Sequence, residues 1–532
     1  MAVKPARAQV RQTAQPNPQA PRDRSKTFPA PARGWIANEN LAMAQPGGAL
    51  VLENWFPTPT GIRTRGGSQK YATISSGPVL RAWTFKSGLV EEFFASDETK
   101  IFNITTVADP NVIPTPVVTG QTSGYYSTAQ ASNAGVTVLS IVNGTDTPKY
   151  YDGATWANHA FTGIATPANL SFVWLFASRL FYVEKNTMSA WYLAVDSING
   201  ALSKFSLAGI FQKGGSLLFG GKWSLDSGDG LDDKCVFVST EGEVAVYQGT
   251  NPGSATDWQK VGLYSITPPL GPNATMSAGG DLMIATEDGI VPISEAVRKD
   301  AAALSISAVT NTIETEWKKE VVNRRLLPWE IMKWPTSNMM VVSLPAVTDG
   351  QTSLCYVSNL KTGAWGKFIG WNVRCLSLFA GEGYFGSSVG TVHRMDTSGS
   401  DDGTPYVCTY VGLPDHVDSP GVTKTINQAR SIFKSNVPFI AQISASVNYA
   451  IDVPSPPSSA ANFSADVWDV GLWDVAIWDA GQATSVSTKW VSVGKTGFSI
   501  SPQVQITCGI TPTPRTELVA FDVLYESGSV MT

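Results

Sequence analysis

Histidine is the scarcest of the side chains that could carry acid–base chemistry in this protein. Only His159, His393 and His416 occur, and they lie far apart in the sequence. A Ser-His-Asp or Cys-His arrangement needs an imidazole beside its nucleophile. The sequence also lacks a G-x-S-x-G elbow, a Walker loop and an H-E-x-x-H run. We therefore expect three ordinary structural histidines and assign no catalytic residue.

The densest group of carboxylates lies in the segment DSGDGLDD, with Asp226, Asp229, Asp232 and Asp233. Hard cations such as Ca²⁺ bind several carboxylate oxygens on a tight loop that contains Gly. The spacing here departs from the register of a calcium loop, so a solvated turn is the default interpretation and a calcium loop the alternative. We predict no metal and no other cofactor.

A glycosidase would need two carboxylates that face each other across a cleft. Glu91, Glu92, Asp226 and Asp229 are the available candidates, and the sequence does not rank them. A propeller-fold hydrolase acting on a polysaccharide therefore stays open as an alternative, although the scarcity of histidine weakens it.

The composition predicts a mainly β protein with many turns. Among 532 residues, 15% are charged, below the usual quarter, and Gly (48), Pro (33) and Trp (17) are abundant. The formal net charge of -5 gives no basic surface for tight binding of nucleic acid. Five scattered cysteines predict buried free thiols. No secretory signal or 18-residue apolar run occurs, so we expect a soluble protein without stable membrane insertion.

Hairpin signals recur along most of the chain. Two apolar runs separated by Gly, Asp or Asn appear, for example, at residues 235–249, 281–294 and 384–396. Their starts are mostly forty to fifty residues apart, about the period of a four-stranded propeller blade. The sequence therefore predicts a β-propeller at residues 35–400, followed by a C-terminal β domain, sandwich-like, at residues 401–532.

One segment interrupts the hairpins. Residues 294–327 carry a helical pattern, with Ser294 as a plausible N-cap and basic residues gathered toward the end. We expect a helical insertion there that projects from the propeller.

The first 34 residues are rich in Pro, Ala and Gln and cannot bury enough surface to fold alone. We interpret them as a disordered tail or as an arm that docks on a neighbouring subunit or a phosphate backbone. The basic residues that would make this docking contact are Lys4, Arg7, Arg11, Arg22 and Arg24.

The segment VWDVGLWDVAIWDAG places Trp468, Trp473 and Trp478 five residues apart. Five is the period of neither a helix nor a strand, and a WD repeat would carry its Trp-Asp pair once in roughly 40 residues. We expect an irregular loop whose tryptophans fill grooves, either within the chain or at a contact with an adjacent subunit.

Several stretches resemble the tail nozzle (tail tube) proteins of short-tailed bacteriophages, the podoviruses. They include ENWFPTPTGIRTRGGSQKY, VNGTDTPKYYDGATW, AGGDLMIATEDGIVPIS and the closing ELVAFDVLYESGSVM, and they span most of residues 50–530. These motifs are turn and strand signatures rather than a reactive constellation.

The resemblance implies a non-enzymatic virion protein, assembled in the host cytoplasm and located in the virion tail. In that family six copies form a ring below the portal-bound adaptor, retain and conduct double-stranded DNA, and carry fibres or spikes. A homohexameric phage nozzle is thus the leading interpretation, and a propeller interaction scaffold is an alternative beside the hydrolase.

Overall fold

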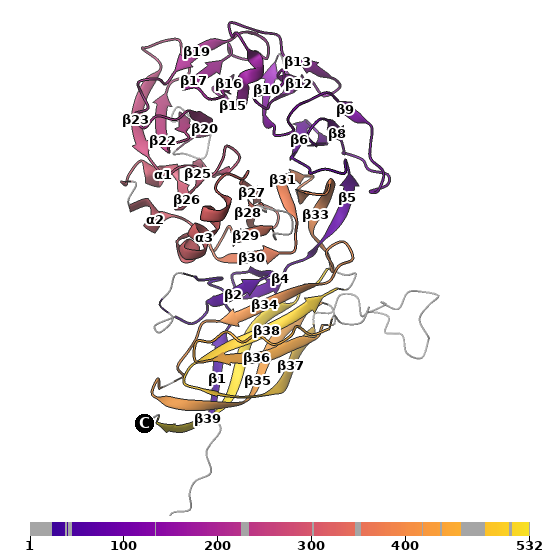
Figure 1. Cartoon of the computed structure of the whole chain (residues 1–532), viewed down its shortest axis with the longest axis vertical. Coiled ribbons are helices and arrows are strands. Elements are labelled where there is room, and N and C mark those ends of the chain that lie inside the picture. Colours follow the sequence, from indigo (N-terminus) through magenta and orange to yellow (C-terminus); the bar gives the residue numbers. More distant parts are fainter. Residues whose placement is uncertain are drawn as a thin grey trace, which may run out of the picture.

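A ring of sheets stands on a two-layered sandwich in the computed structural model of the chain, and one layer of the sandwich continues a sheet of the ring (Figure 1). The structure describes residues 24–37, 40, 45–133, 135–224, 233–300, 303–345, 353–417, 419–436, 439–458, 485–509 and 513–530. The fold is therefore mainly β, and the ring is a β-propeller.

Seven blades within the described residues surround the axis, six as separate sheets and one as half of an eight-stranded sheet that continues into the sandwich (Figure 1). From the axis outward, blade one is β6 (Arg81–Ser87), β7 (Val90–Ser96), β8 (Ile101–Asn103) and β9 (Pro116–Val118). Blade two is β10 (Ser127–Asn133), β11 (Val136–Val142), β12 (Lys149–Tyr151) and β13 (Trp156–Asn158). Blade three is β15 (Leu170–Phe176), β16 (Arg179–Glu184), β17 (Ser189–Tyr192) and β19 (Ser203–Ser206). The short strands β14 (Phe161–Thr162) and β18 (Gly200–Ala201) pair beside it.

The remaining blades continue round the ring. Blade four is β20 (Leu217–Trp223), β21 (Lys234–Ser239), β22 (Glu243–Gln248) and β23 (Gln259–Ser265), and blade five is β24 (Thr275–Ala278), β25 (Asp281–Thr286) and β26 (Gly289–Pro292). Blade six is β27 (Glu330–Trp334), β28 (Met339–Leu344), β29 (Leu354–Asn359) and β30 (Trp365–Ile369). Blade seven is β31 (Val373–Phe379), β32 (Glu382–Ser387), β33 (Thr391–Ser398) and, from near the N-terminus, β5 (Gly67–Thr73).

Strand β5 closes the ring. It precedes blade one in the sequence but pairs antiparallel with β33, the last propeller strand, from Thr73 opposite Thr391 to Gly67 opposite Ser398. Backbone hydrogen bonds between the two ends of the propeller thus join blade one to blade seven without leaving an open seam.

The predicted hairpins are confirmed where the pattern was strongest. The run from residue 235 to 249 forms β21 and β22, and the run from 281 to 294 forms β25 and β26. All six residues of β21 are buried because neighbouring blades cover both faces of an inner strand. This double burial explains why such runs are continuously apolar rather than alternating.

The structure confirms a helical segment at the predicted place, but its helices are short and packed against the propeller. The segment is divided into α1 (Ile293–Ala296), α2 (Leu304–Ser307), the 3-10 turn η4 (Asn311–Ile313) and α3 (Glu314–Arg324). Pro292 occupies the N-cap position of α1, while the Ser294 hydroxyl donates to Asp281 Oδ2 at 2.5 Å. Instead of projecting freely, α3 buries Trp317 completely against blade six.

The sandwich combines both ends of the chain. One sheet contains β3 (Trp55–Pro57), β4 (Ile62–Thr64), β39 (Glu517–Val530), β35 (Val422–Ser435) and β37 (Ser485–Gly497), with β1 (Arg24–Pro29) also paired to β39. The other contains β2 (Ala49–Glu53), β34 (Tyr406–Gly412), β38 (Ile500–Cys508) and β36 (Ala441–Val447). Residues 24–64 therefore belong to the sandwich, which differs from the expected start of the propeller at residue 35.

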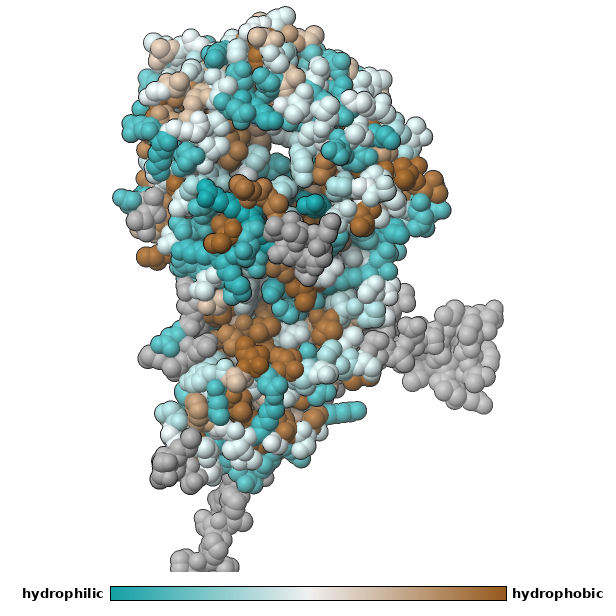
Figure 2. Space-filling model, in the orientation of Figure 1, coloured by the Kyte–Doolittle hydropathy of each residue, from teal (hydrophilic) through white to brown (hydrophobic). Residues whose placement is uncertain are grey.

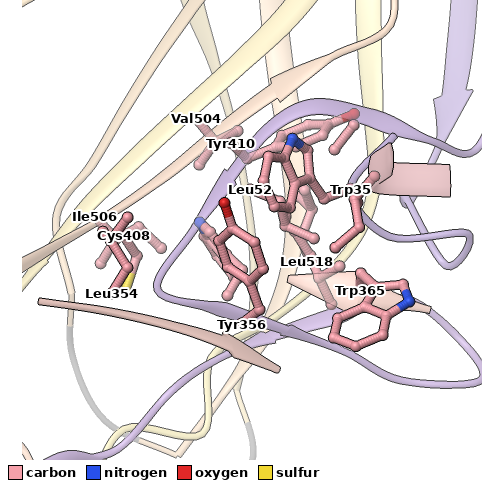
Figure 3. Packing of buried hydrophobic residues seen from close by; sticks show 14 of the residues in the cluster. Trp35, Leu52, Leu354, Tyr356, Trp365, Cys408, Tyr410, Val504, Ile506 and Leu518 are labelled. Atoms are coloured by element: carbon pink, nitrogen blue, oxygen red, sulfur yellow. The ribbon is translucent and has the colours of Figure 1, made fainter. Parts of the chain in front are cut away.

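A single apolar core connects the sandwich to blade six. Trp35 and Leu52, from the N-terminal segment, meet Tyr356 and Trp365 of blade six and Tyr410 of the sandwich (Figure 3). The Trp35 and Tyr356 rings meet edge to face with centroids 5.2 Å apart. Strand β2 also pairs with β30, so backbone hydrogen bonds run between the two domains. The domains are thus built as one packed unit.

The five cysteines are buried with free thiols. Among the described residues, none of the helices has the length and apolarity needed to cross a membrane.

His159 sits in a buried polar network between blades two and three. Its Nδ1 donates to the Ile198 carbonyl at 2.7 Å, and its Nε2 lies 2.9 Å from Ser140 Oγ, which lies 3.2 Å from the Tyr182 hydroxyl. Burial lowers the pKa of His159 to about 4, outweighing the opposing hydrogen bonds. The imidazole is therefore neutral and structural at neutral pH.

This lowered pKa predicts acid sensitivity. Between pH 6.5 and about 4, His159 is protonated in the unfolded chain but neutral in the folded protein. The free energy of unfolding should therefore fall as the pH drops through that window. Urea unfolding at several pH values should show this slope in the wild-type protein. A His159→Gln variant should be less stable at pH 7 but have a flatter slope; an unchanged slope would contradict the assignment.

Candidate assembly surface and domain junction

The carboxylates considered for hydrolysis do not form a facing pair in the described structure. Glu91 and Glu92 are neighbours on β7, so their side chains point to opposite faces of the strand. Glu91 accepts from the Ala380 amide at 3.0 Å. Asp226, Asp229 and Asp232 lie outside the described residues, and Asp233 pairs with Lys222 at 2.7 Å.

The two other histidines have ordinary surroundings. His393 stacks on Phe385 with centroids 5.1 Å apart, and burial lowers its pKa. His416 lies 2.7 Å from the Tyr449 hydroxyl through Nε2. In the described parts of the chain, no group of three or more His, Cys, Asp or Glu residues could hold a metal ion.

The chain passes between the sandwich and the propeller twice, once before β5 and once after β33. Arg65 lies in the first connection and forms an ion pair with Asp401 in the second. Its guanidinium forms a bidentate pair with Asp401, at 2.9 and 2.7 Å, and donates to Asn54 Oδ1 at 2.9 Å and to two backbone carbonyls at 3.0 Å. All five N–H donors are thereby used. The cation also lies over the Tyr406 and Trp371 rings, at 3.8 and 4.6 Å from their centroids. Arg65 is fully buried, so this site is a charged joint inside the protein.

A second ion pair flanks the first. Arg63 holds Asp396 through two contacts, at 3.3 and 2.8 Å, and the Gly66 amide donates to the same carboxylate. Burial alone would raise the pKa of Asp396, but the charge and hydrogen bonds of Arg63, with Arg515 nearby, hold it below its usual value. The carboxylate is therefore charged at neutral pH.

Gly67 is required where the two crossings touch. A Cβ on Gly67 would lie 2.0 Å from the Ser400 carbonyl oxygen, which no side chain tolerates. The outgoing and returning segments are thus packed backbone to backbone.

Strand β37 is an edge of the sandwich. It pairs with β35 on one side and is the last strand in its sheet order, so one row of its backbone groups lacks a strand partner in the described chain. It is 13 residues long and exposes Val486 (63%) and Trp490 (39%). A long exposed edge of this kind can pair with a strand of another protein.

A row of interacting side chains crosses this sheet and ends at Trp490. Thr27 donates to Asp522 at 2.6 Å, and Asp522 accepts from Arg430 Nε at 2.7 Å. Arg430 in turn lies 4.7 Å from the Trp490 ring centroid. The row holds a partly exposed Trp in a fixed position, and Trp and Arg are the residues most enriched at binding hot spots.

Most of the residues predicted as interface sites fall outside the described structure. These are Trp468, Trp473 and Trp478 of the Trp-Asp run and Lys4, Arg7, Arg11 and Arg22 of the N-terminal arm. Arg24 is the first residue of β1 and is exposed on the sandwich. The described chain resumes after the Trp-Asp run at Ser485, the first residue of β37, so that run leads directly into the edge strand.

Sequence reasoning missed Trp490 and Arg430 because the pattern of β37 identifies a strand without showing which strand is its neighbour. Figure 2 shows hydrophobic residues gathered on the sandwich below the ring. Exposed apolar side chains of this domain include Ile440 (45%) and Ile451 (49%). Together with β37, they make the sandwich the candidate assembly surface.

The fold and junction define a seven-bladed β-propeller protein with an integral sandwich. Neither a family model nor a curated protein matches the chain. Similar solved structures are the WD40 β-propeller domain of Doa1 (12% identity, 62% of this chain and 97% of that chain, TM-score 0.37) and the Cps50 (Swd1) propeller of Myceliophteria thermophila (12%, 62% and 99%, TM-score 0.38). YCF48 bound to a D1 peptide is also similar (13%, 62% and 95%, TM-score 0.35). The propeller assignment itself rests on the strand pairing.

Proposed function

We propose that this protein is a non-enzymatic interaction scaffold that assembles with other copies of itself through the sandwich. The observation that carries the proposal is the edge strand β37, which is long and exposed and carries Trp490, held in place by Arg430. The propeller, joined rigidly to the sandwich by the Arg65 pair and the shared core, would then be displayed outward at a fixed angle.

The tail nozzle of a short-tailed phage is the specific form of this scaffold that we propose. The sequence resemblance supports it, and so does the position of the Trp-Asp run immediately before β37. A closed ring needs a heterologous contact, in which an edge on one subunit meets a different surface on the next. Six copies would carry a formal charge of 6 × -5 = -30, so the ring as a whole would not hold DNA tightly.

Light scattering and negative-stain microscopy of the full chain, alone and with phage tail adaptor complexes, test this proposal. We expect a six-fold ring with a central channel, or a monomer that closes into a ring on the adaptor. A ring of other symmetry would support the scaffold and overturn the hexameric nozzle. A monomer that ignores the adaptor would overturn the nozzle and assembly alike.

The edge strand supplies a mutational prediction. Trp490→Ala should leave the fold intact because the side chain is 39% exposed, and should weaken self-association about tenfold or more. Sedimentation velocity over a range of concentrations measures the effect. Leu89→Ala is the control, since Leu89 is fully exposed on the turn between β6 and β7 of propeller blade one. Equal association by both variants would exclude β37 from the interface.

A further inference from the structure

The propeller axis contains a funnel that the proposed assembly does not use. A cavity of about 420 Å³ lies along the inner strands, lined by residues of β6, β10, β15, β24, β27 and β31. A second cavity of about 540 Å³ shares Ser127, Phe172, Pro272 and Asn273 with the first, so the two lie side by side. Figure 2 shows an opening at the centre of the ring.

The inner part of the funnel is basic. Arg81, Lys333 and Glu330 are its charged lining residues, and Glu330 is already neutralised by Arg81 and by the Leu376 amide, which donates at 2.8 Å. Lys333 is partly exposed and forms no ion pair within the described structure. The cavity lining therefore carries one uncompensated positive charge in a protein whose net charge is negative.

Two guanidinium groups in this part of the propeller have a donor without a hydrogen-bond partner in the described residues. The Nε atoms of Arg81 and Arg374 are buried without a hydrogen-bond partner in the described residues. Arg374 lies near Tyr125 at the mouth, where its charge acts on the phenol together with those of Glu330 and Glu98. Arg81 meets Glu330 through Nη1 and also lines the cavity, so its guanidinium places a positive charge at the cavity wall.

The mouth of the funnel is more apolar. Leu326 (94% exposed), Leu327, Pro328 and Tyr125 (39% exposed) stand around it, with Phe172 deeper. A ligand that matches both regions has an anionic end for the inner funnel and apolar groups for the mouth. Cavities of these volumes hold a few amino-acid residues or a ligand of similar size.

We propose that the axial funnel binds a carboxylate presented on an apolar polypeptide segment of a partner protein, with Lys333 and the Arg81 guanidinium as the carboxylate contacts and Leu326 and Tyr125 as the apolar contacts. This goes beyond assembly through the sandwich, because it places a second partner at the propeller axis. The carboxylate could come from a chain terminus or from an acidic side chain, and both sources offer the same chemistry to the cations.

Fluorescence anisotropy with the full-length protein tests the site. The probes are fluorescein-labelled Gly-Gly-Ala-Leu-Leu with a free carboxylate, the same peptide as a terminal amide, and an amidated peptide with one internal Glu. We expect the amide to bind about tenfold or more weakly than the free acid, because one charge-assisted contact is lost. Tighter binding of the internal Glu peptide would identify an acidic side chain as the source.

Substitutions of lining residues test whether the peptide carboxylate binds in the funnel. Lys333→Gln should weaken carboxylate binding about tenfold without changing the amide, and Arg81→Lys should weaken it while keeping the pair with Glu330. Lys260→Gln, on the exposed outer strand β23, is the matched control and should have no effect. Equal binding of the acid, the amide and the internal Glu peptide, an unaffected Lys333→Gln, or the absence of binding at millimolar protein would overturn the proposal. None of these readings depends on ring formation, so assembly can fail while the funnel site holds.

Discussion

Replacing Arg65 by Met should lower the free energy of unfolding by roughly 3–5 kcal/mol, the largest single effect expected in this protein. The variant leaves Asp401 in the junction without its bidentate partner, and it also removes the hydrogen bonds that the guanidinium donates to Asn54 Oδ1 and to two carbonyls. Guanidinium chloride unfolding followed by tryptophan fluorescence measures the loss.

Two further variants separate the burial of a lone charge from the loss of packing. In Arg65→Met/Asp401→Leu both charges are gone, so part of the stability should return. Arg394→Met removes an Arg from a pair with Glu382 in which both side chains are about two-fifths exposed, and it should cost at most about 1 kcal/mol. If Arg65→Met were as mild as Arg394→Met, the junction pair would not hold the domains together.

The second largest effect should come from Trp365→Ala, at roughly 3–5 kcal/mol. Trp365 is fully buried in the core that blade six shares with the sandwich, and its Nε1 donates to the Val309 carbonyl at 3.0 Å (Figure 3). The truncation leaves a cavity and an unpaired carbonyl in the same place. Trp365→Phe, which keeps most of the volume, should be milder.

The shared core also predicts how the calorimetric unfolding transition should change in this variant. Because residues of both domains pack around Trp365, the wild-type protein should unfold in one calorimetric transition. Trp365→Ala should shift or split that transition, whereas Trp490→Ala, at the exposed edge, should leave it unchanged. Two well-separated transitions in the wild-type protein would show that the core does not couple the domains.

The hairpins could be predicted from sequence because their cause is local. In Cys235–Gly249, two apolar runs flank a turn at Glu241 and Gly242, and Gly242 adopts the positive φ (77°) that this turn needs. The helical region was placed correctly for the same reason, although its division into short helices was not foreseen. Buried Trp317 could not be separated by pattern from the exposed Val322 on the same helix.

The candidate site was much less visible in the sequence. The Trp-Asp run and the basic arm carry the sequence signals, but most of their residues lie outside the described structure, while Trp490, Arg430, Arg81 and Lys333 carry no local signal. Each of these four becomes notable only through a neighbour that is distant in the chain.

By itself the sequence determined the β class, the turn positions and the approximate blade period, since alternation, apolar runs and Gly or Asp turns act within a few residues. Only the tertiary structure decided that β5 closes blade seven, that residues 24–64 complete the sandwich, and that Arg65 meets Asp401. Those pairings join residues more than 300 positions apart, as Thr73 with Thr391 shows. Strand periodicity specifies which face of a strand is buried but not which strand lies beside it, so the partner is chosen by the packing of the whole chain.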